Sequence, residues 1–129
     1  MRIRKCANDC VFCFVDQNPP GMRSGIYFRD GDFRMSFLHG HYITLTNMGW
    51  KELKRVVEQR LTPLYISVHV TDPDKRLELF LYGKDDNLLS KFEYLTENGI
   101  KLHSQVVLCP TWNDGVFLEK TIADIHQYA

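Results

Sequence analysis

The stretch Leu64-Tyr65-Ile66-Ser67-Val68-His69-Val70 decides the fold, because it is the clearest strand in the chain. Aliphatic residues occupy every second position, and the positions between them hold Tyr65, Ser67 and His69. A strand of a parallel sheet that is covered on both faces is normally apolar throughout. We therefore expect the aliphatic face to pack against helices and the polar face to line a site near the carboxyl ends of the strands.

Further strands and helices surround this stretch. Residues 42–46 and 101–108 also have the composition of strands. Apolar residues at helical spacing, with typical start and stop residues, predict helices from Gly49 to Arg60, from Pro73 through Leu77, Phe80 and Leu81 to Gly83, from Leu88 through Phe92 and Leu95 to Asn98-Gly99, and from Asn113-Asp114 through Leu118, Ile122 and Ile125. Strands that alternate with helices indicate parallel βαβ units with right-handed crossovers. Because a full (β/α)8 barrel has about 250 residues, we predict an α/β fold that forms about half of a TIM-like barrel.

The other two strands repeat the polar alternation. Tyr42, Thr44 and Thr46 alternate with aliphatic residues in the earlier strand, and Gln105 and Cys109 fall on one face of the later one. Polar side chains inside a barrel are costly unless they are hydrogen-bonded. We therefore expect a polar ligand to occupy the space that these faces line.

Three cysteines lie together near the start of the chain, in Cys6-Ala7-Asn8-Asp9-Cys10-Val11-Phe12-Cys13. A loop with this spacing can turn all three sulfur atoms toward one point. Thiolates are preferred ligands of iron–sulfur clusters and of zinc. Structural zinc normally has four protein ligands, whereas three local thiolates suit a four-iron cluster with one iron left for another ligand.

The spacing, with aromatic Phe12 directly before Cys13, resembles the cluster loop of the radical S-adenosylmethionine (radical SAM) superfamily. Further matching segments resemble one branch of it, the Fe–S oxidoreductase-like proteins with a PDZ-like N-terminal domain and a C-terminal domain of unknown function. These segments are residues 13–17, 20–23, 33–38, 42–47, 67–69, 107–110 and 113–115. The chain departs from the pattern of this branch at Gly31, His41 and Thr111-Trp112. These departures affect the expected shape of the substrate side of the site and not the cluster.

The resemblance implies a radical SAM (β/α)6 barrel, of which this chain would be the N-terminal half. It implies that Cys6, Cys10 and Cys13 hold a [4Fe-4S] cluster and that S-adenosylmethionine binds the free iron and is cleaved to a 5′-deoxyadenosyl radical. The cofactor contacts that it implies are the backbone of Phe12 and the side chains of Thr46, Asn47, Ser67 and His69. A flavodoxin- or ferredoxin-like reductant is the implied partner, and the substrate and catalytic residues cannot be read from the sequence.

Composition and charge set limits on function. The 129 residues have a formal net charge of +0, which gives no electrostatic case for nucleic acid or a membrane surface. No apolar run approaches the roughly 20 residues that span a bilayer, and no secretory signal follows the basic start. Three clustered cysteines without an export signal indicate metal ligands in a reducing cytosol.

We expect one domain over residues 1–129, with a cluster loop at 6–13, an irregular cover at 14–40 and βα units at 41–129. Short strand pairs are expected in the cover around residues 26–28 and 34–36. The cluster loop begins very early and the last residues stop within a helical pattern, so we expect a truncated core that is unstable without a partner or its missing half.

Several alternatives remain open. The cysteines could bind structural zinc with His39, His41 or Cys109 as a fourth ligand, or the chain could be an inactive fragment. His69 could be a core histidine that is hydrogen-bonded to a neighbour, and Asn47 could simply cap a helix. Cys109 is expected to be a small buried apolar residue.

Overall fold

The computed structural model describes residues 2–29, 31–80 and 87–128. Strands β1 (Tyr42–Ile43), β2 (Leu64–Ser67) and β3 (Leu102–Gln105) form one open parallel sheet in the order β1-β2-β3. Tyr42 pairs with Tyr65, which pairs with His103. The structure confirms the predicted α/β class and is consistent with part of a β/α barrel.

The helices follow the strands in the expected alternation. Their bounds are η1 (a 3-10 helix, Ser24–Tyr27), α1 (Phe33–His39), α2 (Trp50–Glu58), α3 (Pro73–Phe80), α4 (Leu88–Glu97) and α5 (Val116–His126). Helix α3 begins at Pro73 as predicted, and Asp72 Oδ1 accepts a hydrogen bond from the amide of Lys75 (3.0 Å). The predicted end of this helix, at Leu81 and Gly83, lies outside the described residues.

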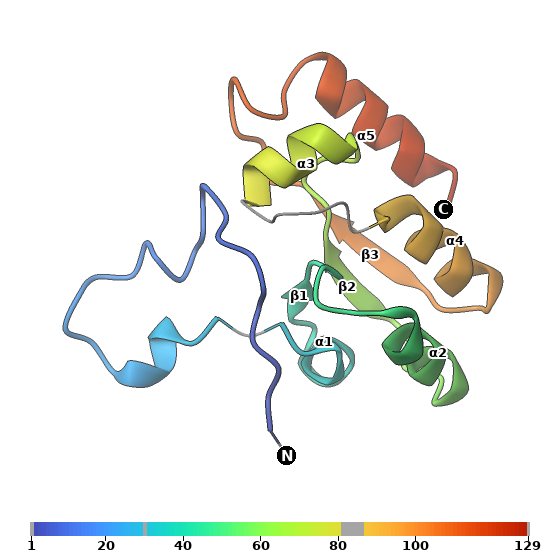
Figure 1. The fold of residues 1–129 in the computed structure, drawn as a ribbon, viewed down its shortest axis with the longest axis horizontal. Coiled ribbons are helices and arrows are strands. Elements are labelled where there is room, and N and C mark those ends of the chain that lie inside the picture. Colours follow the sequence, from blue (N-terminus) through green and yellow to red (C-terminus); the bar gives the residue numbers. More distant parts are fainter. Residues whose placement is uncertain (1, 30, 81–86, 129) are drawn as a thin grey trace.

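The hydrophobic core lies between the sheet and the helices that follow its strands. Helices α2 and α4 lie beside each other on one face of the sheet (Figure 1). The aliphatic face of the strands packs against these two helices. The buried residues of this interface are Ile43, Leu64 and Ile66 from the strands and Leu53, Val56, Phe92 and Leu95 from the helices. Full burial of such a side chain stabilises the fold by about 1.5–3 kcal/mol, so the alternation of β2 fixes which face remains for a site.

The N-terminal segment lies outside these layers. Residues 2–29 run as a long loop beside the sheet and carry η1 (Figure 1). The strand pairs predicted around residues 26–28 and 34–36 are wrong, because η1 and α1 occupy these positions. Local capping explains α1: the Asp32 side chain accepts a hydrogen bond from the amide of Arg34, and Gly40 ends the helix in the left-handed conformation (φ 74°).

Other predicted boundaries also shift. All three strands are shorter than predicted, and the chain leaves β1 and β2 near Leu45 and His69, which have positive φ angles of 64° and 62°. Gly49, rather than Asn47, caps α2, and its amide donates to Glu52 Oε2 (3.0 Å). Helix α5 begins at Val116, later than predicted, and Ile122 is 59% exposed instead of packed.

None of the helices within residues 2–29, 31–80 and 87–128 is both long and apolar enough to cross a membrane.

Candidate functional site

A cavity of about 330 Å³ lies between the cysteine loop and the polar face of the sheet. Six of the residues predicted for the site line it together: Cys6, Cys10, Cys13, Phe12, Ser67 and His69. Its other lining residues are Asn8, Phe14, Val15, Arg29, Tyr42, Thr44 and Gln105. Residues from the polar faces of all three strands therefore line one cavity, as the alternation predicted, although Thr46 and Cys109 are not among them.

Backbone hydrogen bonds hold the cysteine loop against the rest of the fold. The amide of Cys6 donates to the carbonyl of Arg29 (2.7 Å), and the amides of Asp9 and Val11 donate to the carbonyls of Phe80 (2.8 Å) and Leu79 (3.0 Å). A local turn closes the loop, since the amide of Cys13 donates to the carbonyl of Cys10 (3.1 Å). The loop is thus held at its start by Arg29 and further along by the last residues of α3.

Gly31 permits the close approach of the N-terminal segment. A Cβ atom at this position would lie 2.9 Å from Cys6 Cα and 3.1 Å from Asn47 Nδ2. The amide of Gly31 also donates to the carbonyl of Arg4 (3.0 Å). Gly31, one of the positions where the chain departs from the branch, is therefore required by the packing of Cys6.

Burial and neighbouring thiols disfavour the ionisation of Cys6 and Cys10. Burial raises the pKa of Cys10 to about 12, and the neighbouring charges of Cys6 and Cys13 add to this effect. The pKa of Cys6 is also raised, mainly by burial, with Cys13 as a further cause. Thiolates gathered in this way need a positive group among them, and a bound metal deprotonates such thiols.

Asn8 is the clearest polar residue of the cavity that sequence analysis missed. It is 4% exposed, and its Nδ2 donates to Thr44 Oγ1 (2.8 Å). Its Oδ1 is buried and has no hydrogen-bond partner among the described residues. Because such an acceptor costs about 1–3 kcal/mol when left unpaired, its position in a cavity wall indicates a ligand that donates a hydrogen bond.

Arg29 is the cationic residue of the cavity wall, and sequence analysis assigned it no role there. Its guanidinium donates to both carboxylate oxygens of Asp16 (2.6 Å each) and to Asp9 Oδ1 (3.1 Å). Burial dominates the raised pKa values of Cys6 and Cys10, and the charge of Arg29 opposes it. The signal in the sequence was weak, because Arg29 lies far from the cysteines along the chain.

His69 combines a structural contact with a place in the cavity wall. Its Nδ1 accepts a hydrogen bond from the amide of Val107 (2.9 Å), and its ring packs edge-on against Phe12 with the ring centroids 4.7 Å apart. Burial lowers the pKa of His69 to about 3, and the charge of Arg76 contributes. The ring is therefore neutral, and its proton is on Nε2, because Nδ1 acts as an acceptor.

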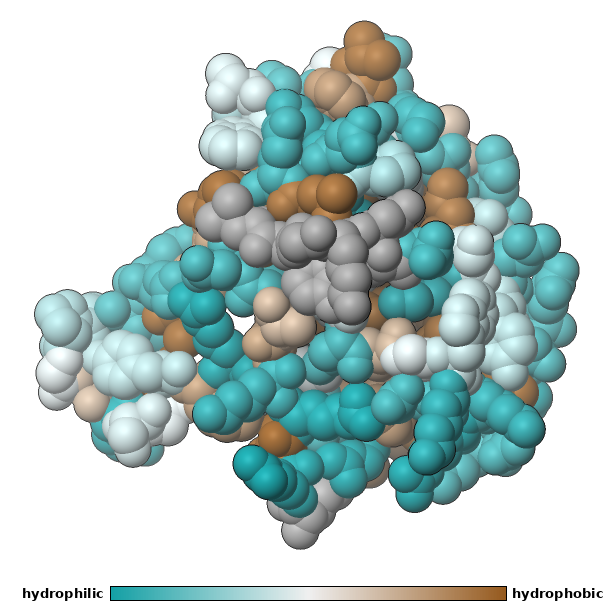
Figure 2. Space-filling view, in the orientation of Figure 1, coloured by the Kyte–Doolittle hydropathy of each residue, from teal (hydrophilic) through white to brown (hydrophobic). Residues whose placement is uncertain are grey.

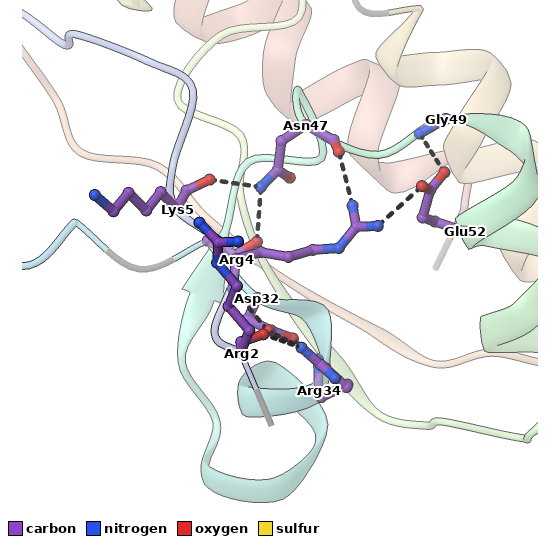
Figure 3. Close-up of polar contacts among 9 residues, drawn as sticks. Arg2, Arg4, Lys5, Asp32, Arg34, Asn47, Gly49 and Glu52 are labelled. Atoms are coloured by element: carbon purple, nitrogen blue, oxygen red, sulfur yellow. Dashed lines mark hydrogen bonds and ion pairs between the residues drawn. The ribbon is translucent and has the colours of Figure 1, made fainter.

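Thr46 and Asn47 are not among the cavity-lining residues. Thr46 is buried with its Oγ1 atom 2.8 Å from Thr44 Oγ1. Asn47 Nδ2 donates to the carbonyls of Lys5 and Gly31 (3.0 Å each), so it ties the N-terminal segment to the turn after β1 (Figure 3). The structure thus gives Asn47 a structural role that neither the cap nor the cofactor prediction described.

The side chains considered as a fourth zinc ligand lie elsewhere. His39, His41 and Cys109 do not line the cavity, and Cys109 is half-buried in a turn held by Asn113 (Cys109 N to Asn113 Oδ1, 2.7 Å). Within the described parts of the chain, no three Cys, His, Asp or Glu side chains stand close enough to hold a single metal ion. Thiolates that ligate a cluster bind different irons and stand further apart than ligands of one ion.

Comparison with models of known protein families identifies the family of the chain. A family model described as the radical SAM-like domain matches residues 1–129. Neither the curated proteins nor the solved structures contain a significant match to the chain. The match covers the cysteine loop and every wall of the cavity.

Proposed function

The chain belongs to the radical SAM-like domain family, and from this we propose that it binds a [4Fe-4S] cluster through Cys6, Cys10 and Cys13 with S-adenosylmethionine beside it. The observation that carries the proposal is that these three cysteines line one cavity with the polar ends of the strands. Three thiolates bind three irons and leave the fourth open to a small ligand.

The chemistry of the cavity wall supports an amino-acid cofactor. The unpaired Oδ1 of Asn8 is an acceptor, and Nε2 of neutral His69 is a donor. Ser67 and Gln105 add groups that can both donate and accept. S-adenosylmethionine carries amino, carboxylate and hydroxyl groups, which match such a mixed wall.

The protein's own part in the reaction is binding, orientation and exclusion of water. Phe12, Phe14 and Val15 form an apolar side of the cavity, and we assign them to shielding the bound cofactor. When bound, the cluster and S-adenosylmethionine would supply one-electron radical chemistry.

The finer assignments rest on the sequence resemblance. We propose membership of the PDZ-containing Fe–S oxidoreductase-like branch and, with it, a flavodoxin- or ferredoxin-like electron donor. All four cysteines are free thiols, which is compatible with the reducing cytosol that we propose as the compartment.

Anaerobic reconstitution with iron and sulfide tests the cluster proposal. We expect about four irons per chain, loss of most of that iron in Cys10→Ala, and retention in Cys109→Ala, since Cys109 lies outside the cavity. Cys109→Ala is a matched control because it also removes a half-buried thiol. Loss of metal in both variants, with zinc as the bound metal, would establish the closed four-ligand site instead.

A further inference from the structure

Another cavity, of about 300 Å³, lies between the N-terminal segment, α1 and α2. Its lining residues, which we call the basic pocket, are Arg4, Phe33, Arg34, Lys51, Glu52, Arg55 and Gln59. None of them lines the cysteine cavity. The surface over α1 and α2, in the lower part of the view, is largely hydrophilic (Figure 2).

Two arginines of the basic pocket are held in place by their own partners (Figure 3). Arg4 donates to Glu52 Oε1 (3.0 Å) and to the carbonyl of Asn47 (3.3 Å), and it lies over the ring of Phe33. Arg34 donates through Nε and Nη2 to the buried carboxylate of Asp32 (2.9 and 2.6 Å). Each guanidinium is therefore positioned in advance and keeps further N–H groups for a ligand.

The other two cations of the pocket, Lys51 and Arg55, are not paired with a carboxylate of the described residues. No ion pair or hydrogen bond of the Lys51 or Arg55 side chain occurs within the described residues. They lie four positions apart on α2, so they share one face of the helix, and like charges at this spacing destabilise a helix. The chain has a net charge of +0, so this concentration of positive charge is a local feature.

We propose that the basic pocket binds a small phosphorylated anion. Arg4 and Arg34 are neutralised by Glu52 and Asp32, which leaves the charges of Lys51 and Arg55 for the ligand. A phosphate group carries about −1.5 to −2 charges near neutral pH, and its oxygens match the planar donor fork of arginine. A concave volume of this size is at the lower end for small-molecule sites, which favours a phosphorylated metabolite over a flat macromolecular surface.

Calorimetric titration with inorganic pyrophosphate, at an ionic strength fixed with NaCl, tests the site. We expect the parent protein to bind it in the millimolar range or tighter. The double variant Lys51→Gln/Arg55→Gln should bind at least about tenfold more weakly, because each charge-assisted contact is worth roughly tenfold in affinity. Both side chains are exposed, so the double variant should keep its circular dichroism spectrum. The single variants Lys51→Gln and Arg55→Gln measure the contribution of each charge to binding separately.

Lys54→Gln is the matched control. Lys54 lies on the same helix, its side chain is 71% exposed, and it is outside the basic pocket. Binding that the control keeps and the double variant loses supports the proposal. The proposal would be overturned if the parent does not bind pyrophosphate, or if Lys54→Gln weakens binding as much as the double variant does. It would also be overturned if titration with NaCl in place of pyrophosphate gives the same heat signal.

Discussion

Replacement of Asp32 by Asn should destabilise the fold through the loss of one buried charge. The Asp32 carboxylate is 0% exposed and accepts hydrogen bonds from the amides of Arg4 and Arg34 (2.9 Å each) and from the Arg34 guanidinium. It thereby joins the cap of α1 to the segment that leads into Cys6. Asn preserves the size of the side chain and remains a good N-cap, so the substitution isolates the charge.

The magnitude follows from the pKa of this carboxyl group. The Arg34 hydrogen bonds lower it from 3.8 to about 2, against the opposing effect of burial, and the two backbone amides contribute. At about 1.4 kcal/mol per pKa unit, the charge contributes about 2–2.5 kcal/mol near neutral pH. Because the folded pKa is depressed, this stability is fully present above pH 3.8 and is lost as the pH falls toward about 2.

Urea denaturation of the metal-free, reduced protein, followed by tryptophan fluorescence, measures the effect. We expect Asp32→Asn to lower the free energy of unfolding by about 2 kcal/mol at neutral pH, and by about half as much near pH 3. Asp114→Asn removes an exposed carboxylate and should change it by less than about 0.5 kcal/mol. An effect of Asp32→Asn as small as that of the control, or one that stays constant down to pH 3, would show that the buried charge does not stabilise the fold.

Three further predictions concern His69 in the cavity wall and two residues, Asn47 and Gly31, that position the N-terminal segment. Asn47→Ala should lower stability by about 1–3 kcal/mol in urea denaturation, because two hydrogen bonds to the carbonyls of Lys5 and Gly31 are lost; unchanged stability would contradict its structural role. Gly31→Ala should displace the backbone at Cys6 and lower iron uptake on reconstitution, and full uptake would show that the segment adapts. His69 is neutral in the fold with a pKa of about 3, so apo-protein stability should fall as the pH drops below about 6.5, and His69→Gln should flatten that slope between pH 7 and 5.

The sequence predicted the fold and most of the cavity wall for identifiable reasons. The alternation of Tyr65, Ser67 and His69 with aliphatic residues placed the polar face correctly, because burial imposes a strict period of two on a strand. His69 reaches the cavity although β2 ends at Ser67, since the chain turns there with a positive φ angle. Such a turn has no simple signature in a non-glycine residue.

Contacts between distant segments account for what the sequence did not predict. Asn8 and Arg29 belong to the cavity through their partners Thr44 and Asp16, and no local pattern marks these pairs. Asn47 has the residue type of a helix cap, but its amide satisfies two carbonyls of the N-terminal segment instead. Side chains that can serve several hydrogen-bonding roles are assigned by tertiary packing rather than by propensity.

Electron paramagnetic resonance of the reduced, reconstituted protein, with and without S-adenosylmethionine, tests whether the three cysteines hold a cluster that has one open iron. Three cysteines around one cavity should leave one iron of a four-iron cluster without a protein ligand. We expect a cluster signal in the parent that changes when S-adenosylmethionine is added, and no cluster signal in Cys10→Ala with or without S-adenosylmethionine. A parent protein that forms no cluster, or whose cluster signal is unaffected by saturating S-adenosylmethionine, would contradict this expectation.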